Sequence, residues 1–283
     1  MRIWVILAGL LLSACQHVSA PPQVVGEIRD LRTGRVLSAQ ELVSQLAKSA
    51  RLIVGEQHDN RDHHELQRWL LQSMGDQRPQ GSLLLEMLTP DQQARVDDLR
   101  QAPTLPADLP GALAWQAGWD WNLYGPIVSF ALTQPYPLLA ANLDTNEVRA
   151  IYAKPPVLSG SRTNAETVRA QLLAQVSESH CGLLPESQMP AMLAVQQQRD
   201  RRMAQRLIAA PAPALLLAGA YHARKDVGVP IHVLDLGPAQ APTVLMLAEQ
   251  GNEVTAAVAD YVWYTPVTQA PDYCAQMREQ FGK

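Results

Sequence analysis

The apolar residues of this chain form short uninterrupted runs, and the segments between them have polar and apolar positions at helical spacing. Four runs have the length and composition of strands that are buried on both faces of a sheet. They span residues 51–54, 82–87, 137–141 and 214–218. The alternation of such runs with helical segments predicts an α/β fold in which helices flank a central mixed, largely parallel sheet.

Weaker patterns add elements to this sheet. Residues 24–36 contain β-prone pieces separated by turn residues and predict a small hairpin before the main sheet. Three further runs, 231–236, 243–247 and 261–264, predict additional short strands. No linker or charge block divides the 283 residues, so we expect a single domain with a helical insertion.

The segment from 51 to 74 combines a strand, a charged loop and a helix. Gly55 ends the apolar run and is predicted to close the strand, because glycine adopts positive φ without steric cost. Asp62 and Glu65 form a capping-box pair that predicts the start of a helix, with Gly75 just beyond its end. The residues that follow the apolar run are dense in groups that transfer protons or bind metals: Glu56, His58, Asp59, His63 and His64.

Polar residues of catalytic type lie at or just after the end of each of the four buried runs. They are Glu56 with His58, then Glu86, then Asn142, and finally His222 with Arg224. Parallel strands deliver their carboxyl ends to the same edge of a sheet, where ligands bind in open α/β folds. We therefore expect these side chains to meet in one site although they are far apart in the sequence.

Composition and charge exclude some functions. Apolar residues make up 47% of the chain and charged residues 18%, which is typical of a folded globular protein. The formal net charge is −4 and the sequence contains no block of Lys and Arg, so nucleic acid is not an expected partner.

The first residues have the pattern of an export signal. A basic start precedes an apolar run over 3–12 that is too short to span a bilayer, and Leu12, Ser13 and Ala14 then lead to Cys15. The last four residues resemble the lipobox of bacterial lipoproteins, which implies a signal peptide over 1–14, a lipidated Cys15, a tether over 15–24 and a domain over 25–283. Gln16 implies the outer membrane by the same resemblance. An ordinary secretory signal is the alternative.

Two other cysteines, Cys181 and Cys274, remain in the exported chain. An even pair in an oxidising compartment predicts a disulfide. The alternative is a metal site that uses His180 and Cys181, but no second close ligand pair accompanies them.

Two local patterns have competing interpretations. Trp115, Trp119 and Trp121 lie in an irregular segment over 103–124 and predict either a local core or the wall of a pocket for a large flat aromatic ligand. The charged run over 199–202 predicts a solvated helix face or pairing within the helix.

Three motifs resemble those of the ChaN-like haem-binding lipoproteins of bacterial iron uptake, a family related to the erythromycin-esterase-like and Tiki/TraB-type proteins. They are GEQHD at 55–59, LLLEM at 83–87 and AGAYHARKDVGVPIH at 218–232. The resemblance covers about residues 24–274. It implies a lipid-anchored outer-membrane protein of haem and iron acquisition that forms a homodimer on binding haem, with up to two haems per dimer. It leaves open which haem receptor or periplasmic carrier is the partner.

The same resemblance implies that a tyrosine binds the haem iron. Tyr221 is the first candidate and Tyr124 the second, because a phenolate is a good ligand for ferric haem. Arg224 and Lys225 lie beside Tyr221 in the sequence and suit the propionates. A second ligand or further propionate donors are predicted among the histidines His58, His63, His64 and His222.

A metal-dependent hydrolase, either an esterase or a peptidase, is the alternative function. Glu56 and Glu86 would then provide a general base, and His58 and His222 metal ligands or proton donors. The sequence contains neither an HExxH helix nor a GxSxG elbow, which counts against this interpretation. A purely structural lipoprotein is a third class, and the clustering of polar residues after the strands disfavours it.

Overall fold

The computed structural model describes residues 26–238, 240–269 and 271–281. The predicted signal peptide, Cys15, the tether and the first residues of the predicted hairpin lie outside the described residues. In the part described, the strands are β1 (Ile28–Asp30), β2 (Val36–Leu37), β3 (Arg51–Glu56), β4 (Ser82–Leu85), β5 (Leu138–Ala140), β6 (Ala214–Gly219), β7 (Thr243–Glu249) and β8 (Tyr261–Thr265).

The helices of the described residues lie mostly between these strands. They are α1 (Ala39–Leu46), α2 (Arg61–Gln77), α3 (Gln93–Gln101), α4 (Leu109–Ala112), α5 (Trp121–Leu132), α6 (Thr145–Ala153), α7 (Glu166–Ser179), α8 (Met189–Ala209), α9 (Ala220–Ala223), α10 (Val229–Asp235) and α11 (Tyr273–Phe281). Two 3-10 turns, η1 (Pro90–Gln92) and η2 (Glu186–Gln188), precede α3 and α8.

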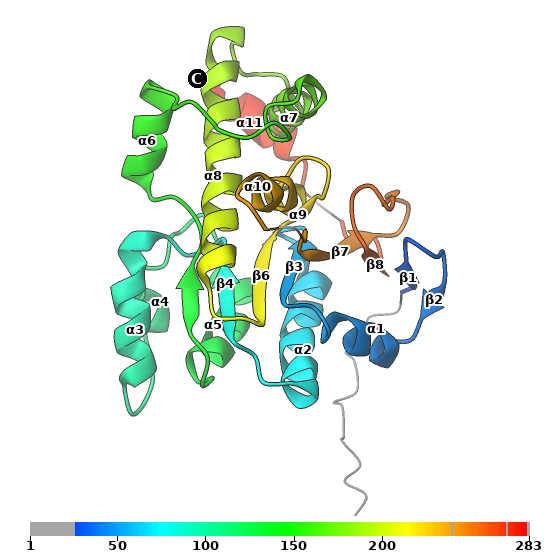
Figure 1. The fold of residues 1–283 in the computed structure, drawn as a ribbon. Helices are drawn as coiled ribbons and strands as arrows, with labels where there is room; N and C mark the ends of the chain where they lie inside the picture. The colour runs from blue at the N-terminus through cyan, green and yellow to red at the C-terminus, as the bar shows by residue number, and fades with distance from the viewer. Residues whose placement is uncertain (1–25, 239, 270, 282–283) are drawn as a thin grey trace, which may run out of the picture.

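The strands form one sheet in the order β2-β1-β8-β7-β3-β6-β4-β5. The six strands from β8 to β5 run parallel, whereas β1 pairs antiparallel with both β8 and β2. The predicted mixed, largely parallel sheet is therefore confirmed, together with the N-terminal hairpin. Strands β3 and β6 lie side by side at its centre, so the residues that follow them share one edge (Figure 1).

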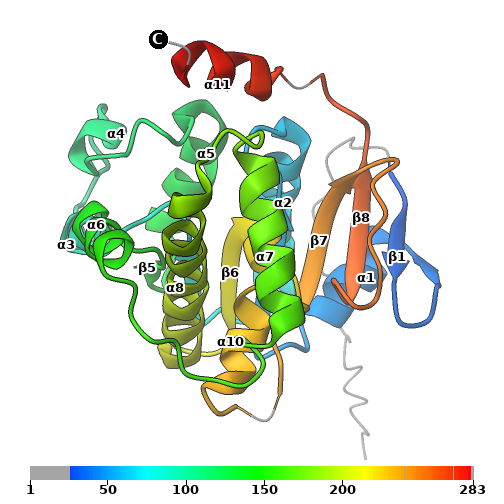
Figure 2. The same cartoon turned by 90° about the horizontal axis from the view of Figure 1, so that it is seen from above.

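Helices cover both faces of the sheet, as Figures 1 and 2 show. One core lies between the sheet and α1, α2 and α5, and it takes Leu52 and Val54 from β3. The other lies under α8 and α10 and takes Ile53. Successive side chains of a strand point to opposite faces, so a strand with helices on both sides must be apolar throughout, as the predicted runs are.

Three local predictions were wrong. The run over 231–236 is not a strand but most of α10, which begins after Gly228 with Pro230 in its first turn and packs against α8. A short buried helix and a short buried strand have the same apolar pattern, so periodicity does not separate them. Helix α2 is capped by the side chain of Asn60 rather than by Asp62, and it continues past Gly75 to Gln77.

Gly55 has a different role from the one predicted. It does not end the strand, since β3 continues through it to Glu56, and it is not among the glycines with positive φ. A Cβ atom at this position would lie 2.6 Å from Ala223 Cβ and 2.8 Å from Met246 Sδ. Glycine is therefore required because α9 packs directly on β3, and this contact fixes the segment that contains Tyr221 and His222.

A search of the described residues for a helix long and apolar enough to cross a bilayer found none.

Candidate functional site

The carboxyl ends of the central strands bring three acidic and histidine residues together. Glu56 is the last residue of β3 and lies opposite Gly219, the last residue of β6, in the parallel register. Glu86 follows β4 directly, and its Oε2 accepts a hydrogen bond of 2.7 Å from the Gly219 amide. His222 belongs to α9, the turn of helix after β6. Glu56, Glu86 and His222, which were expected to meet at this edge, therefore do so.

Glu56 is the centre of the first group. Its buried Oε1 lies 2.7 Å from His58 Nδ1 and accepts a hydrogen bond of 2.9 Å from the Tyr124 hydroxyl. Burial by itself would lower the pKa of His58, but the hydrogen bond and the charge of Glu56 outweigh it and raise that pKa to about 9. His58 is consequently an imidazolium near neutral pH.

Glu86, His222 and Asp200 form the second group. His222 Nδ1 is 2.6 Å from Asp200 Oδ1, and its Nε2 is 3.4 Å from Glu86 Oε1. All three side chains are buried. Burial would lower the pKa of His222, but the carboxylates of Glu86 and Asp200 raise it, so the group contains an imidazolium between two acids.

Gly219 lies between the two groups, where there is no room for a side chain. A Cβ atom at this position would lie 2.7 Å from His58 Nε2 and 3.6 Å from Glu86 Oε2. Any other residue would push His58 away from the strand end. The two groups therefore make a continuous polar floor at this edge of the sheet.

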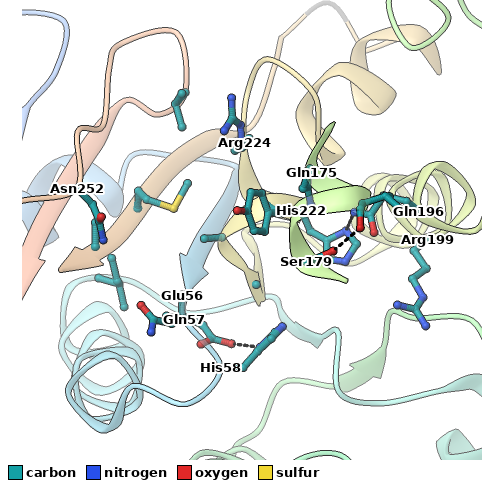
Figure 3. Close-up of a pocket in the computed structure, with 18 of the residues that line it drawn as sticks. Glu56, Gln57, His58, Gln175, Ser179, Gln196, Arg199, His222, Arg224 and Asn252 are labelled. Atoms are coloured by element: carbon teal, nitrogen blue, oxygen red, sulfur yellow. Dashed lines mark hydrogen bonds and ion pairs between the residues drawn. The ribbon is translucent and has the colours of Figure 1, made fainter. Parts of the chain in front are cut away.

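A cavity of about 820 Å³ opens above this floor, within the range of about 300–1,000 Å³ that is typical of small-molecule sites. Figure 3 shows Glu56 and His58 at the end of β3, with α7 and α8 on one side and the end of β7 on the other. The α7 and α8 side contributes Gln175, Val176, Ser179, His180, Met192, Val195, Gln196 and Arg199. The side chains of Met246, Leu247, Ala248, Val254 and Val258 supply apolar surface near β7.

Tyr221 lies on the wall of this cavity and is 43% exposed, whereas Tyr124 is 1% exposed and does not line it. Burial, then the charge of Glu178, raises the pKa of Tyr221, and the nearby Arg224 opposes this. The pKa of Tyr124 is raised far more strongly, by burial and then by Glu56. Of these two tyrosines, Tyr221 is therefore the one that combines access from the cavity with a neighbouring cation that favours phenolate.

The remaining predicted site residues differ in their positions. Arg224 lines the cavity and makes a two-point contact with Asp226, at 2.9 and 2.6 Å. Lys225 is not on the cavity wall, because its Nζ pairs with Asp260 at 2.8 Å. Asn142 is also outside the wall, and its side chain accepts a hydrogen bond from the Leu143 amide. The structure thus separates Lys225 and Asn142 from the site.

His63 and His64 lie in the core of the protein. His63 Nδ1 accepts a hydrogen bond of 3.0 Å from the Gln57 amide, and its Nε2 lies 3.1 Å from Thr265 Oγ1. His64 Nε2 donates to the His58 carbonyl oxygen at 3.0 Å. These histidines hold the loop after β3 in place and do not line the cavity.

The charged run on α8 contradicts the prediction of a solvated face. Asp200 and Arg201 are buried, Arg199 lines the cavity, and Arg202 reaches α6, where its Nη1 lies 3.3 Å from Glu147 Oε2. Four consecutive residues of a helix point about 100° apart and so cover nearly its whole circumference. If a helix with such a run packs against the protein on one side, some of the charged side chains must be buried. The four consecutive charged residues in the sequence therefore already indicated buried charges on this helix.

The tryptophan segment forms a local core. Trp115, Trp119 and Trp121 pack partly buried against the main core, and none of them lines the cavity. The ring of Trp119 meets that of His58 edge-on, with centroids 4.9 Å apart, so it supports the floor from outside. The prediction of a tryptophan pocket wall is therefore wrong.

The thiols of Cys181 and Cys274 are joined in a disulfide that connects the residue after His180 to α11. The Cys181 thiol is therefore not available to pair with His180 as a metal ligand. Among the described residues, no group of three or more His, Cys, Asp or Glu side chains has an arrangement that could hold a metal ion. The titratable side chains of the floor form ion pairs with one another.

The protein has an open α/β sheet, and a cavity lined by polar and apolar residues lies outside the carboxyl ends of the central strands. These features are typical of a ligand-binding α/β protein. The family model described as "Haem-binding uptake, Tiki superfamily, ChaN" matches residues 42–233. The chain therefore belongs to the ChaN family of haem-binding uptake proteins.

A solved structure described as "Cofacial heme binding to ChaN of Campylobacter jejuni" is similar, with 29% identity and a TM-score of 0.79 over 86% of this chain and 97% of that one. A structure of an erythromycin esterase mutant in its open conformation has 11% identity and a TM-score of 0.46, over 89% of this chain and 86% of the other. A comparison with curated proteins found no match.

Proposed function

We propose that this protein binds haem in the cavity, with the Tyr221 phenolate as the iron ligand, and that it acts in haem and iron acquisition. The observation that carries this proposal is the position of Tyr221, whose ring lies half exposed on the wall of a large, partly apolar cavity. Tyrosine is an established ligand for haem iron. Membership of a haem-binding family and the similarity to a haem-binding ChaN from Campylobacter jejuni support haem as the ligand.

The residues around the cavity fit a porphyrin with acidic side groups. Apolar side chains near β7, such as Met246 and Val254, suit the porphyrin plane, whereas the cations lie on the α8 and α9 side. Bound haem would supply the iron chemistry. The protein's own residues would provide the Tyr221 oxygen, with Arg224 favouring its anionic form against burial and Glu178, and would exclude water from the apolar side.

Tyr221 is a better candidate than Tyr124. The Tyr124 hydroxyl donates to Glu56 beneath the floor, and releasing its proton would place a second negative charge beside a buried carboxylate. The histidines at this edge are engaged as well, since His58 pairs with Glu56 and His222 with Asp200. We therefore assign them to the support of the floor rather than to the iron.

Two further parts of the proposal concern assembly and location. Tyr221 and Tyr152 are exposed aromatic residues of the cavity wall, at 43% and 38% exposure, and a second copy bound there would cover them and the haem. The lipobox-like residues before Cys15 support lipid anchoring to the outer membrane. Light scattering with and without haem tests the dimer, and the intact mass of the exported protein tests lipidation.

Titration with ferric haem is the direct test. Protein comprising residues 16–283 should shift the Soret band and develop the charge-transfer band of tyrosinate ligation. A spectrum that remains that of free haem would reject the proposal. Hydrolysis of an ester or peptide substrate on addition of zinc or manganese would instead support the hydrolase alternative, which the described residues do not favour because they contain no metal-binding group.

Glu56→Gln separates binding from catalysis. Glu56 is buried below the cavity, and glutamine keeps an oxygen that can accept from Tyr124, so we expect the affinity for ferric haem to change by less than roughly threefold. Parallel absorbance titrations of the wild type and the variant measure this. Abolition of a measurable hydrolytic turnover by the same substitution would show that Glu56 acts in catalysis instead.

A further inference from the structure

Arg199 stands out among the cations of the cavity because it has no hydrogen-bond partner in the described residues. It projects from α8 into the wall, across the pocket from Asn252 (Figure 3). Its Nε atom is buried and makes no hydrogen bond in the described part of the chain. A buried guanidinium nitrogen without an acceptor is costly, so such a group requires an explanation.

The other arginine of the wall is already neutralised. Arg224 forms a fork-to-fork pair with Asp226, in which Nε and Nη2 donate to the two carboxylate oxygens at 2.9 and 2.6 Å. Across the cavity, Glu249 at the end of β7 and Glu253 in the segment after it contribute two acids. The cavity is therefore electrically asymmetric, and an anionic group of a ligand is repelled from the β7 side and attracted to Arg199.

Arg199 also lies near the buried group below it. Burial is the largest influence on the pKa of Glu86 and raises it, but His222, His58 and, to a smaller extent, Arg199 lower it overall. Burial raises the pKa of Asp200, which Arg199 opposes, so the competing role for Arg199 is that of a purely structural counter-charge to the buried acids Glu86 and Asp200. The two roles differ in what they imply for ligands of different charge.

We infer that Arg199 binds a carboxylate of the ligand and restricts the cavity to tetrapyrroles that have a free propionate group. This inference rests on the proposed function and adds a residue to it. The planar guanidinium presents paired donors that match the two oxygens of a carboxylate. The terminal guanidinium nitrogens of Arg199, which have no acceptor among the described residues, would donate to it from the side of the cavity opposite Glu249 and Glu253.

Ferric haem and its dimethyl ester, delivered from the same detergent solution, test this inference. The ester keeps the iron and the porphyrin plane but lacks the negative charges. We expect the wild type to bind haem about 10- to 100-fold more tightly than the ester, the range of a charge-assisted contact. In Arg199→Gln this ratio should fall to nearly one, because the affinity for haem decreases and that for the ester does not.

Arg202→Gln is the matched control, because it removes the same charge from the same helix at a residue that pairs with Glu147 outside the cavity. It should keep the wild-type ratio. Arg199→Lys is a second variant that preserves the charge beside Glu86 and should retain only part of the ratio, since lysine lacks the fork. Circular dichroism of each variant checks that the fold is intact.

The outcomes are distinct. Equal binding of haem and its ester by the wild type, with a tyrosinate spectrum for both, would overturn the inference and leave the proposed function in place. Equal weakening of both ligands in Arg199→Gln would assign Arg199 to the structural counter-charge and also overturn it. Binding of neither ligand by the wild type would reject the proposed function and the inference with it.

Discussion

Tyr221→Phe is expected to remove the charge-transfer band and to weaken ferric haem binding by about 100-fold or more, since the loss of an iron ligand should exceed the roughly 10- to 100-fold effect of an outer-shell partner. The substitution removes a single hydroxyl from a ring that is 43% exposed, so the fold should be preserved. Absorbance titration and thermal unfolding of the same preparation measure both effects.

Two tyrosines of this chain provide controls. Tyr152→Phe removes a hydroxyl from the same cavity wall, at α6, and should leave the spectrum and affinity at wild-type values. Tyr124→Phe removes the buried hydrogen bond to Glu56 and should lower the free energy of unfolding by about 1 kcal/mol without loss of the charge-transfer band. If Tyr221→Phe keeps the tyrosinate band and Tyr124→Phe loses it, our choice of ligand is wrong.

Acidification is expected to destabilise the apoprotein strongly between about pH 6.5 and pH 4.5. Burial is the main cause that lowers the pKa of His63 to about 4 and that of His232 to about 3. In the unfolded chain both imidazoles take up a proton near pH 6.5, whereas in the folded chain they stay neutral to a much lower pH. The stability that the two neutral histidines contribute is therefore complete above pH 6.5 and is lost as the pH falls. Each histidine can remove roughly 1.4 kcal/mol per pH unit in this window.

The structure supplies the reason for both shifts. His63 must be neutral because its Nδ1 accepts the Gln57 amide proton, and both ring nitrogens of His232 lie buried without a hydrogen-bond partner in the described residues. Urea unfolding at a series of pH values should show a loss of roughly 3–5 kcal/mol over this range. Replacing both histidines by glutamine should flatten the curve. A wild-type curve that is already flat would contradict the assignment.

His58 has the opposite dependence. Its pKa is raised to about 9, so the stability contributed by its pairing with Glu56 is complete below pH 6.5 and is lost as the pH rises through about 9. The floor of the cavity is therefore most stable in weakly acidic to neutral solution.

Much of the architecture could be predicted from local sequence. A strand with helices on both faces must be apolar at every position, and β3, β4, β5 and β6 all have this pattern. Parallel strands share one carboxyl edge, which is why Glu56, Glu86 and His222 could be expected to meet. The prediction of a strand over 231–236 was wrong because short apolar helices and strands have the same composition. Packing against α8 decided that this segment is a helix.

The sequence by itself determined which strands are buried, where the polar residues gather and to which family its motifs belong, because these depend on patterns within a few residues. Only the tertiary structure decided which of the tyrosines faces the cavity and that Asp200 and Arg199 belong to the site. Burial and charge pairing depend on neighbours from distant segments: Tyr124 meets Glu56 across 68 residues, and Asp200 meets His222 through the packing of α8 on the sheet.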